Sequence, residues 1–191
     1  MTAGERAPIL LEICIPTYNR SKFLDRVLSQ ISAQIFEHQL GAHVRVHVSD
    51  NASTDDTRSV MEKWGREHGD WDFSRRTANI GAAANFMSLV NASRARYVWL
   101  FGDDDEFVGD TALADVIESL VACGPDLLVM SSAGEVEGEN GHRSFRNLRE
   151  YADDAMRRDP DIFRRTTWIT ANVFRPELIS RGLTVPGLER D

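Results

Sequence analysis

The sequence predicts an α/β domain whose sheet is mostly parallel and is covered by helices on both faces. Short aliphatic runs alternate along the chain with segments whose apolar residues recur at helical spacing. This alternation of strand and helix patterns is typical of parallel sheets with helical connections. A length of 191 residues suits one domain with a core of ordinary size.

The first part of the chain begins with a strand, a helix and a second strand. Residues 9–15 are aliphatic and end at Pro16, which predicts a buried strand. Residues 21–36 carry an apolar stripe that predicts an amphipathic helix, and residues 44–48 alternate valine with polar residues, as a strand does. The stripe of the helix consists of Phe23, Leu24, Val27, Leu28, Ile31 and Ile35.

The same alternation continues through the middle of the chain. Ser53 and Asp56 predict a capping box at the start of a second helix. A short strand is expected over residues 71–74, a helix over 82–92, and a buried strand over 97–101. Together these segments extend the parallel sheet by two strands.

The last clearly patterned elements are a helix and a strand before residue 132. The helix carries apolar residues from Leu113 to Val121 and stops at Gly124, and residues 127–130 predict another buried strand. The pattern then weakens: residues 134–141 predict an acidic, glycine-rich loop. Near the end, residues 167–174 regain apolar character and residues 176–180 predict a short helix.

Composition excludes several classes of protein. A content of 42% hydrophobic and 27% charged residues is that of a folded soluble domain. The net charge of −8 argues against a nucleic-acid partner, which requires clusters of Lys and Arg. No run approaches the ~20 apolar residues of a membrane span, and no signal peptide is apparent. We therefore expect a cytoplasmic protein, which could also act at the inner face of the membrane. Cys14 and Cys123 are expected to be buried free thiols.

Three consecutive carboxylates follow the fourth predicted strand. Asp103, Asp104 and Asp105 come directly after Gly102, at the carboxyl end of the run 97–101. Such carboxylates repel one another unless a cation lies among them, and hard oxygen ligands suit Mg²⁺ or Mn²⁺ shared with substrate phosphates. The alternative is a solvated acidic turn that caps the next helix.

Polar residues also follow the other predicted strands, at the edge of an open sheet where ligands bind. Their chemistry suits a nucleotide: Tyr18 offers a ring for stacking, the backbone of Pro16 and Thr17 can meet the edge of a base, and Asp50 can accept from a ring N–H. Gly81 allows the chain to approach a ribose or base closely. Arg20 is equally compatible with a phosphate contact and with a surface residue at the start of a helix.

Four segments together resemble the family 2 glycosyltransferases of GT-A fold, in the nucleotide-diphospho-sugar transferase superfamily. These segments are Cys14-Ile-Pro-Thr-Tyr-Asn-Arg20, Val48-Ser-Asp-Asn-Ala-Ser-Thr-Asp-Asp56, Asn79-Ile-Gly-Ala-Ala-Ala-Asn85 and Leu100-Phe-Gly-Asp-Asp-Asp105. Their order and spacing match the family over roughly residues 9–132. The fold implied is a Rossmann-like, mostly parallel sheet.

The resemblance implies a metal-dependent, inverting transfer of a sugar from a nucleotide-diphosphate sugar, most simply a UDP-sugar, to a hydroxyl acceptor. The acceptor would belong to a polysaccharide, a lipid or a natural product. By residue-by-residue carry-over, the residues that hold the nucleoside are Thr17, Tyr18, Asp50 and Asn79. Asp103 would face the ribose, and Asp104, with Asp105 second, would reach the Mg²⁺ or Mn²⁺ ion. The family usually has an acid where this chain has Gly102, which leaves the choice between the last two ligands open.

The resemblance also implies a catalytic base after a Phe-Arg-x-Glu-Leu stretch, here residues 174–178, and Asp191 is the candidate. We expect one domain over residues 1–191, in which 9–132 binds the nucleotide sugar and 133–191 forms an acceptor side that ends early. A truncated chain, a minimal enzyme and a non-catalytic nucleotide-sugar-binding module all remain open. A sugar-phosphate nucleotidyltransferase would need a glycine-rich basic loop after the first strand, which residues 16–20 lack.

Overall fold

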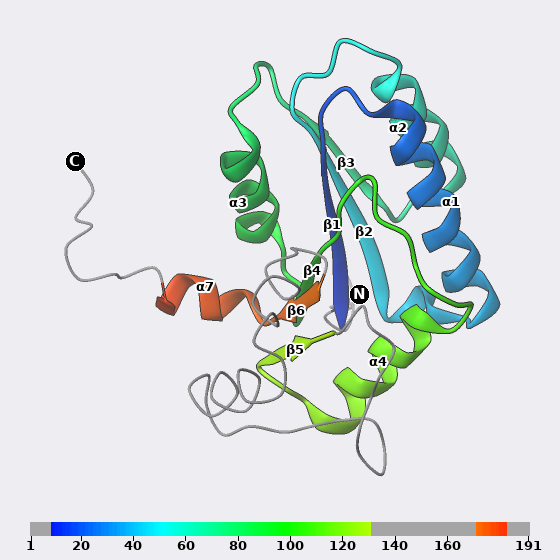
Figure 1. The fold of residues 1–191 in the computed structure, drawn as a ribbon, viewed down its shortest axis with the longest axis vertical. Coiled ribbons are helices and arrows are strands. Elements are labelled where there is room, and N and C mark those ends of the chain that lie inside the picture. The colour runs from blue at the N-terminus through cyan, green and yellow to red at the C-terminus, as the bar shows by residue number, and fades with distance from the viewer. Residues whose placement is uncertain (1–8, 131–170, 183–191) are drawn as a thin grey trace, which may run out of the picture.

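Strand β1 (Leu11–Thr17) lies in the interior of a six-stranded sheet in a computed structural model that describes residues 9–130 and 171–182 (Figure 1). The order of the strands across the sheet is β3-β2-β1-β4-β6-β5. The other strands are β2 (Val44–Asp50), β3 (Asp72–Arg75), β4 (Tyr97–Leu100), β5 (Leu127–Val129) and β6 (Asn172–Phe174). The helices are α1 (Ser21–Glu37), the short 3₁₀ helix η1 (Leu40–Ala42), α2 (Thr57–Glu67), α3 (Ala82–Ala92), α4 (Ala112–Cys123) and α7 (Pro176–Gly182).

The first four strands are parallel, as the sequence predicts. β1 pairs with β2 along its whole length, so that Thr17 lies opposite Asp50 at the carboxyl ends. On the other side β1 pairs with β4, with Cys14 opposite Leu100, and Phe101 N–H donates to Cys14 O at 2.9 Å. The chain after β4 therefore continues along the last residues of β1, which brings the acidic turn to the end of that strand.

One side of the sheet departs from the parallel pattern. β6 runs antiparallel to both β4 and β5 and lies between them, although β5 precedes it by more than 40 residues in the sequence. The expectation that residues 127–130 form a buried strand is wrong in one respect: β5 is an outer strand, and Leu127 is exposed. The mostly parallel sheet is nevertheless confirmed.

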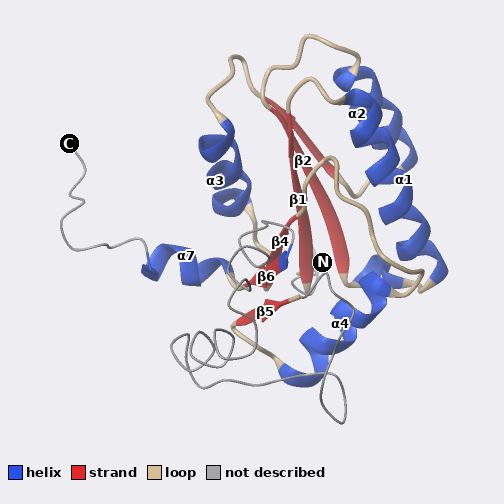
Figure 2. Ribbon diagram, viewed as in Figure 1, coloured by secondary structure: helices blue, strands red, loops and turns tan. Residues whose placement is uncertain are grey.

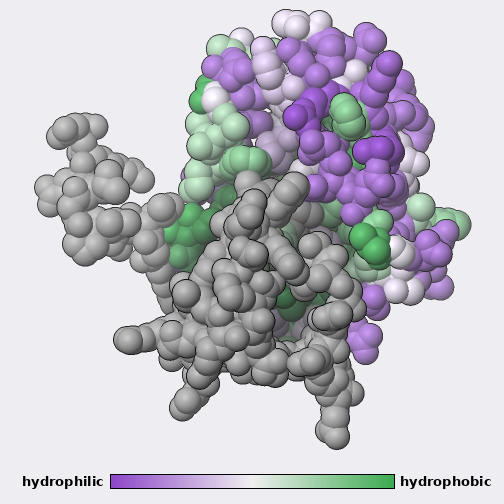
Figure 3. Space-filling model, in the orientation of Figure 1, coloured by the Kyte–Doolittle hydropathy of each residue, from purple (hydrophilic) through white to green (hydrophobic). Residues whose placement is uncertain are grey.

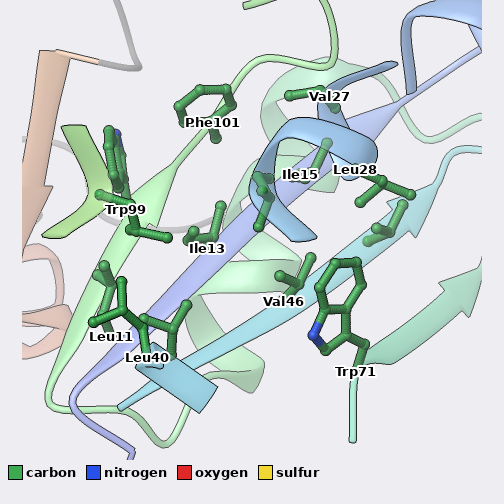
Figure 4. Close-up of a cluster of buried hydrophobic side chains, with 14 of the residues drawn as sticks. Leu11, Ile13, Ile15, Val27, Leu28, Leu40, Val46, Trp71, Trp99 and Phe101 are labelled. Atoms are coloured by element: carbon green, nitrogen blue, oxygen red, sulfur yellow. The ribbon is translucent and has the colours of Figure 1, made fainter. Parts of the chain in front are cut away.

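Helices cover both faces of the sheet, as Figure 2 shows. Alternate residues of β1 point to opposite faces because side chains alternate along a strand. Leu11, Ile13 and Ile15 pack in the larger core, formed with α1 and α4 (Figure 4). Cys14 packs on the other face against Leu89 of α3 and neighbours from β4 and β6. In the view of Figure 3, the described surface is hydrophilic over α1 and α2 and more apolar over α3.

Three local expectations are wrong. The capping box does not form, because α2 begins at Thr57 and Ser53 N–H donates instead to Asp50 Oδ1 at 2.8 Å. Cys123 is exposed at the last turn of α4, whereas Cys14 is buried, where desolvation raises its thiol pKa. Val121, one of the apolar residues whose pattern predicts α4, is 67% exposed and so does not contribute to the core.

Part of the prediction lies outside the described residues. The candidate base Asp191 and most of the segment 133–191, expected to form the acceptor side, belong to that part, so the structure does not test them. Within residues 9–130 and 171–182, no helix is long and apolar enough to cross a membrane.

Candidate functional site

The carboxyl ends of β1 and β4 are joined by a buried hydrogen bond between two predicted site residues. Thr17 Oγ1 donates to Asp103 Oδ2 at 2.7 Å, and both residues are buried. Burial raises the pKa of the Asp103 carboxyl, although the bond from Thr17 and the charge of Arg20 act in the opposite direction. Two residues 86 positions apart in the sequence therefore form one polar contact at the edge of the sheet.

Asp50 lies at the same edge, at the end of β2, and is completely buried. Its Oδ1 accepts from Ser53 N–H, and its Oδ2 lies 3.0 Å from Arg75 Nη1. That ion pair lacks hydrogen-bond geometry, so Oδ2 receives no hydrogen bond in the described part of the chain. A buried carboxylate oxygen with unused acceptor capacity is costly, and a ligand N–H would relieve that cost.

Gly102 lies close to the carboxylates of the acidic turn after β4. Asp105 Oδ2 folds back to accept from Gly102 N–H at 3.1 Å. A Cβ atom at position 102 would collide with that same oxygen. Gly102 therefore leaves room for this position of the Asp105 carboxylate, and the exposed Asp104 pairs through its Oδ2 atom with Arg20.

Arg20 pairs with the two leading carboxylates of the turn. Its Nη1 atom forms an ion pair with Asp104 Oδ2 and lies 3.5 Å from Asp103 Oδ1. The hydrogen bond to Asp104, followed by the charge of Asp103, raises the pKa of the guanidinium. Arg20 is thus a member of the site and not an isolated surface residue at the start of α1.

Tyr18 and Pro16 flank Thr17 at the end of β1. Tyr18 is 43% exposed, which leaves its ring available for stacking on a ligand, and Pro16 is half-buried. Pro16 is part of β1 and lies opposite Ser49 of β2. Both residues lie at the strand end where the sequence predicts the nucleoside pocket.

Asn79 and Gly81 organise the turn before α3. Asn79 Oδ1 accepts from Asn51 Nδ2 and from Gly81 N–H, each at 2.9 Å, and Asn51 Oδ1 accepts from Ile80 N–H at 2.9 Å. Gly81 has φ 85° and ψ 156°, a conformation that is essentially restricted to glycine. The loops after β2 and β3 are thus joined beside Asp50.

Two residues that the sequence analysis did not single out hold the loops after β1 and β2 together. Asn19 Oδ1 accepts from Thr54 N–H at 2.7 Å. Asp55 accepts from the backbone N–H groups of Ser21, at the start of α1, and Thr57, at the start of α2. Although burial opposes its ionisation, a hydrogen bond from the Thr57 hydroxyl, together with these backbone bonds, lowers the pKa of Asp55 to about 2. The sequence signal for this role is that Asn19 and Asp55 are residue types whose short side chains often bond backbone N–H groups in loops.

The acidic turn supplies the oxygen ligands that suit Mg²⁺ or Mn²⁺, but it is not a preformed metal cage. The described residues contain no group of three or more His, Cys, Asp or Glu side chains placed to hold a metal. An ion with one or two carboxylate ligands takes its remaining ligands from phosphates and water. Asp104 and Asp105 fit that kind of site, and a guanidinium already lies on Asp104, where positive charge is favoured.

Comparison with known proteins decides the family. A family model described as "Glycosyl transferase family 2" matches residues 12–175, most of the chain. The chain belongs to this family. It is 26% identical over 185 residues to abequosyltransferase RfbV of Salmonella typhimurium, covering 94% of this chain and 50% of RfbV. The poly(ribitol-phosphate) β-N-acetylglucosaminyltransferase TarS of Staphylococcus aureus is 25% identical over 122 residues, 64% of this chain and 21% of TarS.

Solved structures of glycosyltransferases share the fold. TarS residues 1–349 superpose with a TM-score of 0.64 at 19% identity over 91% of this chain and 49% of that chain. A mannosyltransferase of Pyrobaculum calidifontis, in complex with GDP-Man and Mn²⁺, has a TM-score of 0.62 at 18% identity over 92% of this chain and 47% of that chain. The expected GT-A fold is confirmed. The chain spans about half the length of RfbV and of the crystallised TarS fragment, and a smaller share of full-length TarS.

Proposed function

We propose that this chain binds a nucleotide-diphosphate sugar and takes part in metal-dependent, inverting transfer of the sugar to a hydroxyl acceptor. The observation that carries the proposal is the meeting of two polar groups at one edge of the sheet. Asp50 Oδ2 is a buried acceptor atom that receives no hydrogen bond from the residues the structure describes, and Thr17 bonds the acidic turn to the end of β1. The first group suits a nucleoside and the second a diphosphate with its cation.

The nucleoside would be held by residues at the ends of the four parallel strands. Asp50 Oδ2 would accept a ring N–H, Tyr18 would stack on the base, and Asn79 and Gly81 would border the ribose or base from the side of α3. Pro16 and Thr17 would present backbone groups to the base edge, with Asp103 facing the ribose. A pyrimidine or purine that offers a ring N–H satisfies the same pocket, so UDP-, dTDP- and GDP-sugars are all candidates, of which a UDP-sugar is the simplest.

The diphosphate would lie at the acidic turn. Asp104, with Asp105 second, would hold a Mg²⁺ or Mn²⁺ ion, which supplies positive charge that stabilises the departing nucleoside diphosphate. Inversion requires a base on the opposite face of the sugar to deprotonate the acceptor hydroxyl. Asp191 remains the predicted base. The sugar transferases among the relatives, and a fold neighbour in complex with GDP-Man and Mn²⁺, support the proposed donor and metal sites.

Calorimetric titration with a UDP-sugar tests the donor site, in the presence and absence of Mn²⁺. Asp104→Asn is expected to weaken Mn²⁺-dependent binding by about tenfold or more, because it removes a charged ligand. Asp110→Asn is the matched control, since it changes an exposed carboxylate later in the same loop and should leave binding unchanged. Equal affinity of wild type and Asp104→Asn for the donor with Mn²⁺ would contradict the metal assignment.

Turnover needs a separate measurement, because a non-catalytic binding module would also bind the donor. Thermal-shift screening with Mn²⁺ across UDP-, dTDP- and GDP-sugars identifies the base. The preferred donor is then incubated with a panel of polysaccharide, lipid and natural-product acceptors. Transfer or hydrolysis supports the enzyme. An intact donor that nonetheless binds tightly supports the binding module instead.

A further inference from the structure

The loop between β4 and α4 lies along α1 and is attached to it from end to end (Figure 1). The attachments run from Arg20 to Asp103 and Asp104, from Arg26 to Glu106, from Gln34 to Gly109 O and Leu113 N–H, and from His38 to Asp110 O. Arg20 and Arg26 attach the loop by ion pairs, whereas Gln34 and His38 attach it by hydrogen bonds to backbone atoms. The ion pairs are confined to the part of the loop that carries the acidic turn.

The two ion pairs are closely similar except for their position. Arg20 and Arg26 lie on either side of Phe23 in the sequence, with guanidinium carbons 5.8 and 5.6 Å from the centre of its ring. The arginine side chains are 45% and 48% exposed, and their partners Asp104 and Glu106 are both 50% exposed. Phe23, expected on the buried face of α1, is instead a half-exposed platform for both guanidinium groups.

The position of each pair decides what it can do. Asp104 adjoins the buried Asp103, so two carboxylates lie side by side at the edge of the sheet. Among the described residues, Arg20 is the one cationic side chain paired with either of them. Glu106 lies two residues beyond Asp104, and within residues 9–130 and 171–182 it is the one carboxylate paired with Arg26. Arg20 therefore holds the place that a divalent ion would need at Asp104.

We propose that Arg20 is a positioning residue that neutralises Asp104 in the donor-free protein, yields this carboxylate to a divalent cation, and then binds the donor diphosphate. The proposal rests on the proposed function. A guanidinium and a divalent ion cannot share the same carboxylate oxygen without strong repulsion. The released guanidinium has a planar set of donors that matches phosphate oxygens, and its half-exposed side chain is free to turn.

Arg20 then has opposite effects on the two ligands. Without nucleotide it competes with the cation, so Arg20→Ala is expected to tighten Mn²⁺ binding by about three- to tenfold, as removal of a half-exposed competing charge would. With saturating Mn²⁺ the same variant loses a phosphate contact, so UDP binding is expected to weaken by about tenfold. A residue that only supports the fold would weaken both.

Mn²⁺ binding is measured on nucleotide-free protein by electron paramagnetic resonance of the free ion, and UDP binding by calorimetry at saturating Mn²⁺. Arg20→Gln introduces a neutral residue of similar length and is the second variant, in case the alanine variant folds poorly. It is expected to tighten Mn²⁺ binding and weaken UDP binding in the same way. Arg20→Lys keeps the charge and should leave Mn²⁺ affinity close to wild type while weakening UDP. Arg26→Ala, the matched control, should change neither affinity.

The outcomes separate this inference from the proposed function. If wild type binds both ligands and the neutral Arg20 variants weaken Mn²⁺ binding or leave both affinities unchanged, the role of Arg20 is wrong and the donor site stands. The inference would also be overturned if Arg26→Ala tightened Mn²⁺ binding as much as Arg20→Ala does. The effect would then come from the loss of any nearby positive charge and not from Arg20 in particular. If wild type binds neither Mn²⁺ nor UDP, the proposed function itself fails.

Discussion

Replacing Thr17 with valine removes the buried donor that joins the ends of β1 and β4. Thr17 and Asp103 are both buried, and their hydrogen bond is 2.7 Å long. A hydrogen bond to a charged group contributes about 1.5–3 kcal/mol, and a buried acceptor that loses its donor bears the desolvation cost. Since Arg20 Nη1 still lies 3.5 Å from the other carboxylate oxygen, we expect a loss near the middle of that range, about 2 kcal/mol.

Equilibrium unfolding in urea measures this loss, with Thr54→Val as the control. Thr54 is exposed and its hydroxyl donates to Asn19 Oδ1 at 3.3 Å, so the same chemical change there should cost less than about 0.5 kcal/mol. A comparable loss for both variants would show that valine is simply unfavourable in these loops. A loss below about 0.5 kcal/mol for Thr17→Val would refute the energetic role of the bond.

The dependence of this loss on pH provides a second check. Burial raises the pKa of Asp103 in the folded protein, so its contribution to stability is full at low pH and is lost as the pH rises through the raised value. The Thr17→Val variant lacks the hydroxyl that bonds the ionised Asp103 carboxylate, so the pKa of Asp103 should rise further. The difference between wild type and Thr17→Val should therefore be greatest near neutral pH and shrink on acidification. A difference that grows as the pH falls would contradict the assigned cause.

Three further changes have defined outcomes. Gly81→Ala should destabilise by about 1–3 kcal/mol in urea, because of its φ of 85° and not because of a clash, since no atom lies within 4 Å of the added Cβ. Gln34→Leu should cost about 1–3 kcal/mol, because its Oε1 is the acceptor for the buried Leu113 N–H at 2.7 Å; a neutral result in the same assay would contradict this. Asp55→Asn should cost at most about 1 kcal/mol at neutral pH because the side chain is exposed. That difference should disappear as the pH falls from 3.8, the unperturbed value, through about 2, which thermal unfolding against pH would show.

Much of the fold was readable because each strand and helix carries its own periodicity. The predicted ranges for α1, β2, α3 and β4 agree closely with the structure, whereas β1 lies two residues later than the predicted 9–15 and continues through Pro16. The capping box at residues 53–56 was mistaken because Ser53 and Asp55 are used between loops, and local spacing does not reveal partners of that kind. The antiparallel β6 was not foreseen, since its pairing partners β4 and β5 lie far earlier in the chain.

In the candidate site, too, the sequence reveals the residue types but not their partners. The residue types at the strand ends, with Asp50 and the acidic turn foremost, indicate a nucleotide and a cation from the sequence alone. Their partners were not apparent: Arg75 lies 25 positions from Asp50, and Arg20 lies 84 positions from Asp104. The close contact at Gly102 was likewise hidden, because it depends on where the Asp105 carboxylate folds.

Local pattern thus defined which segments are strands and helices and which chemistry follows each strand, because hydrophobic periodicity and residue type act over a few neighbouring residues. Tertiary structure decided which charges neutralise one another, which acceptor stays without a hydrogen bond, and which carboxylate remains exposed. Those properties depend on distances between atoms from separate loops, and the packing of the sheet and α1 sets these distances.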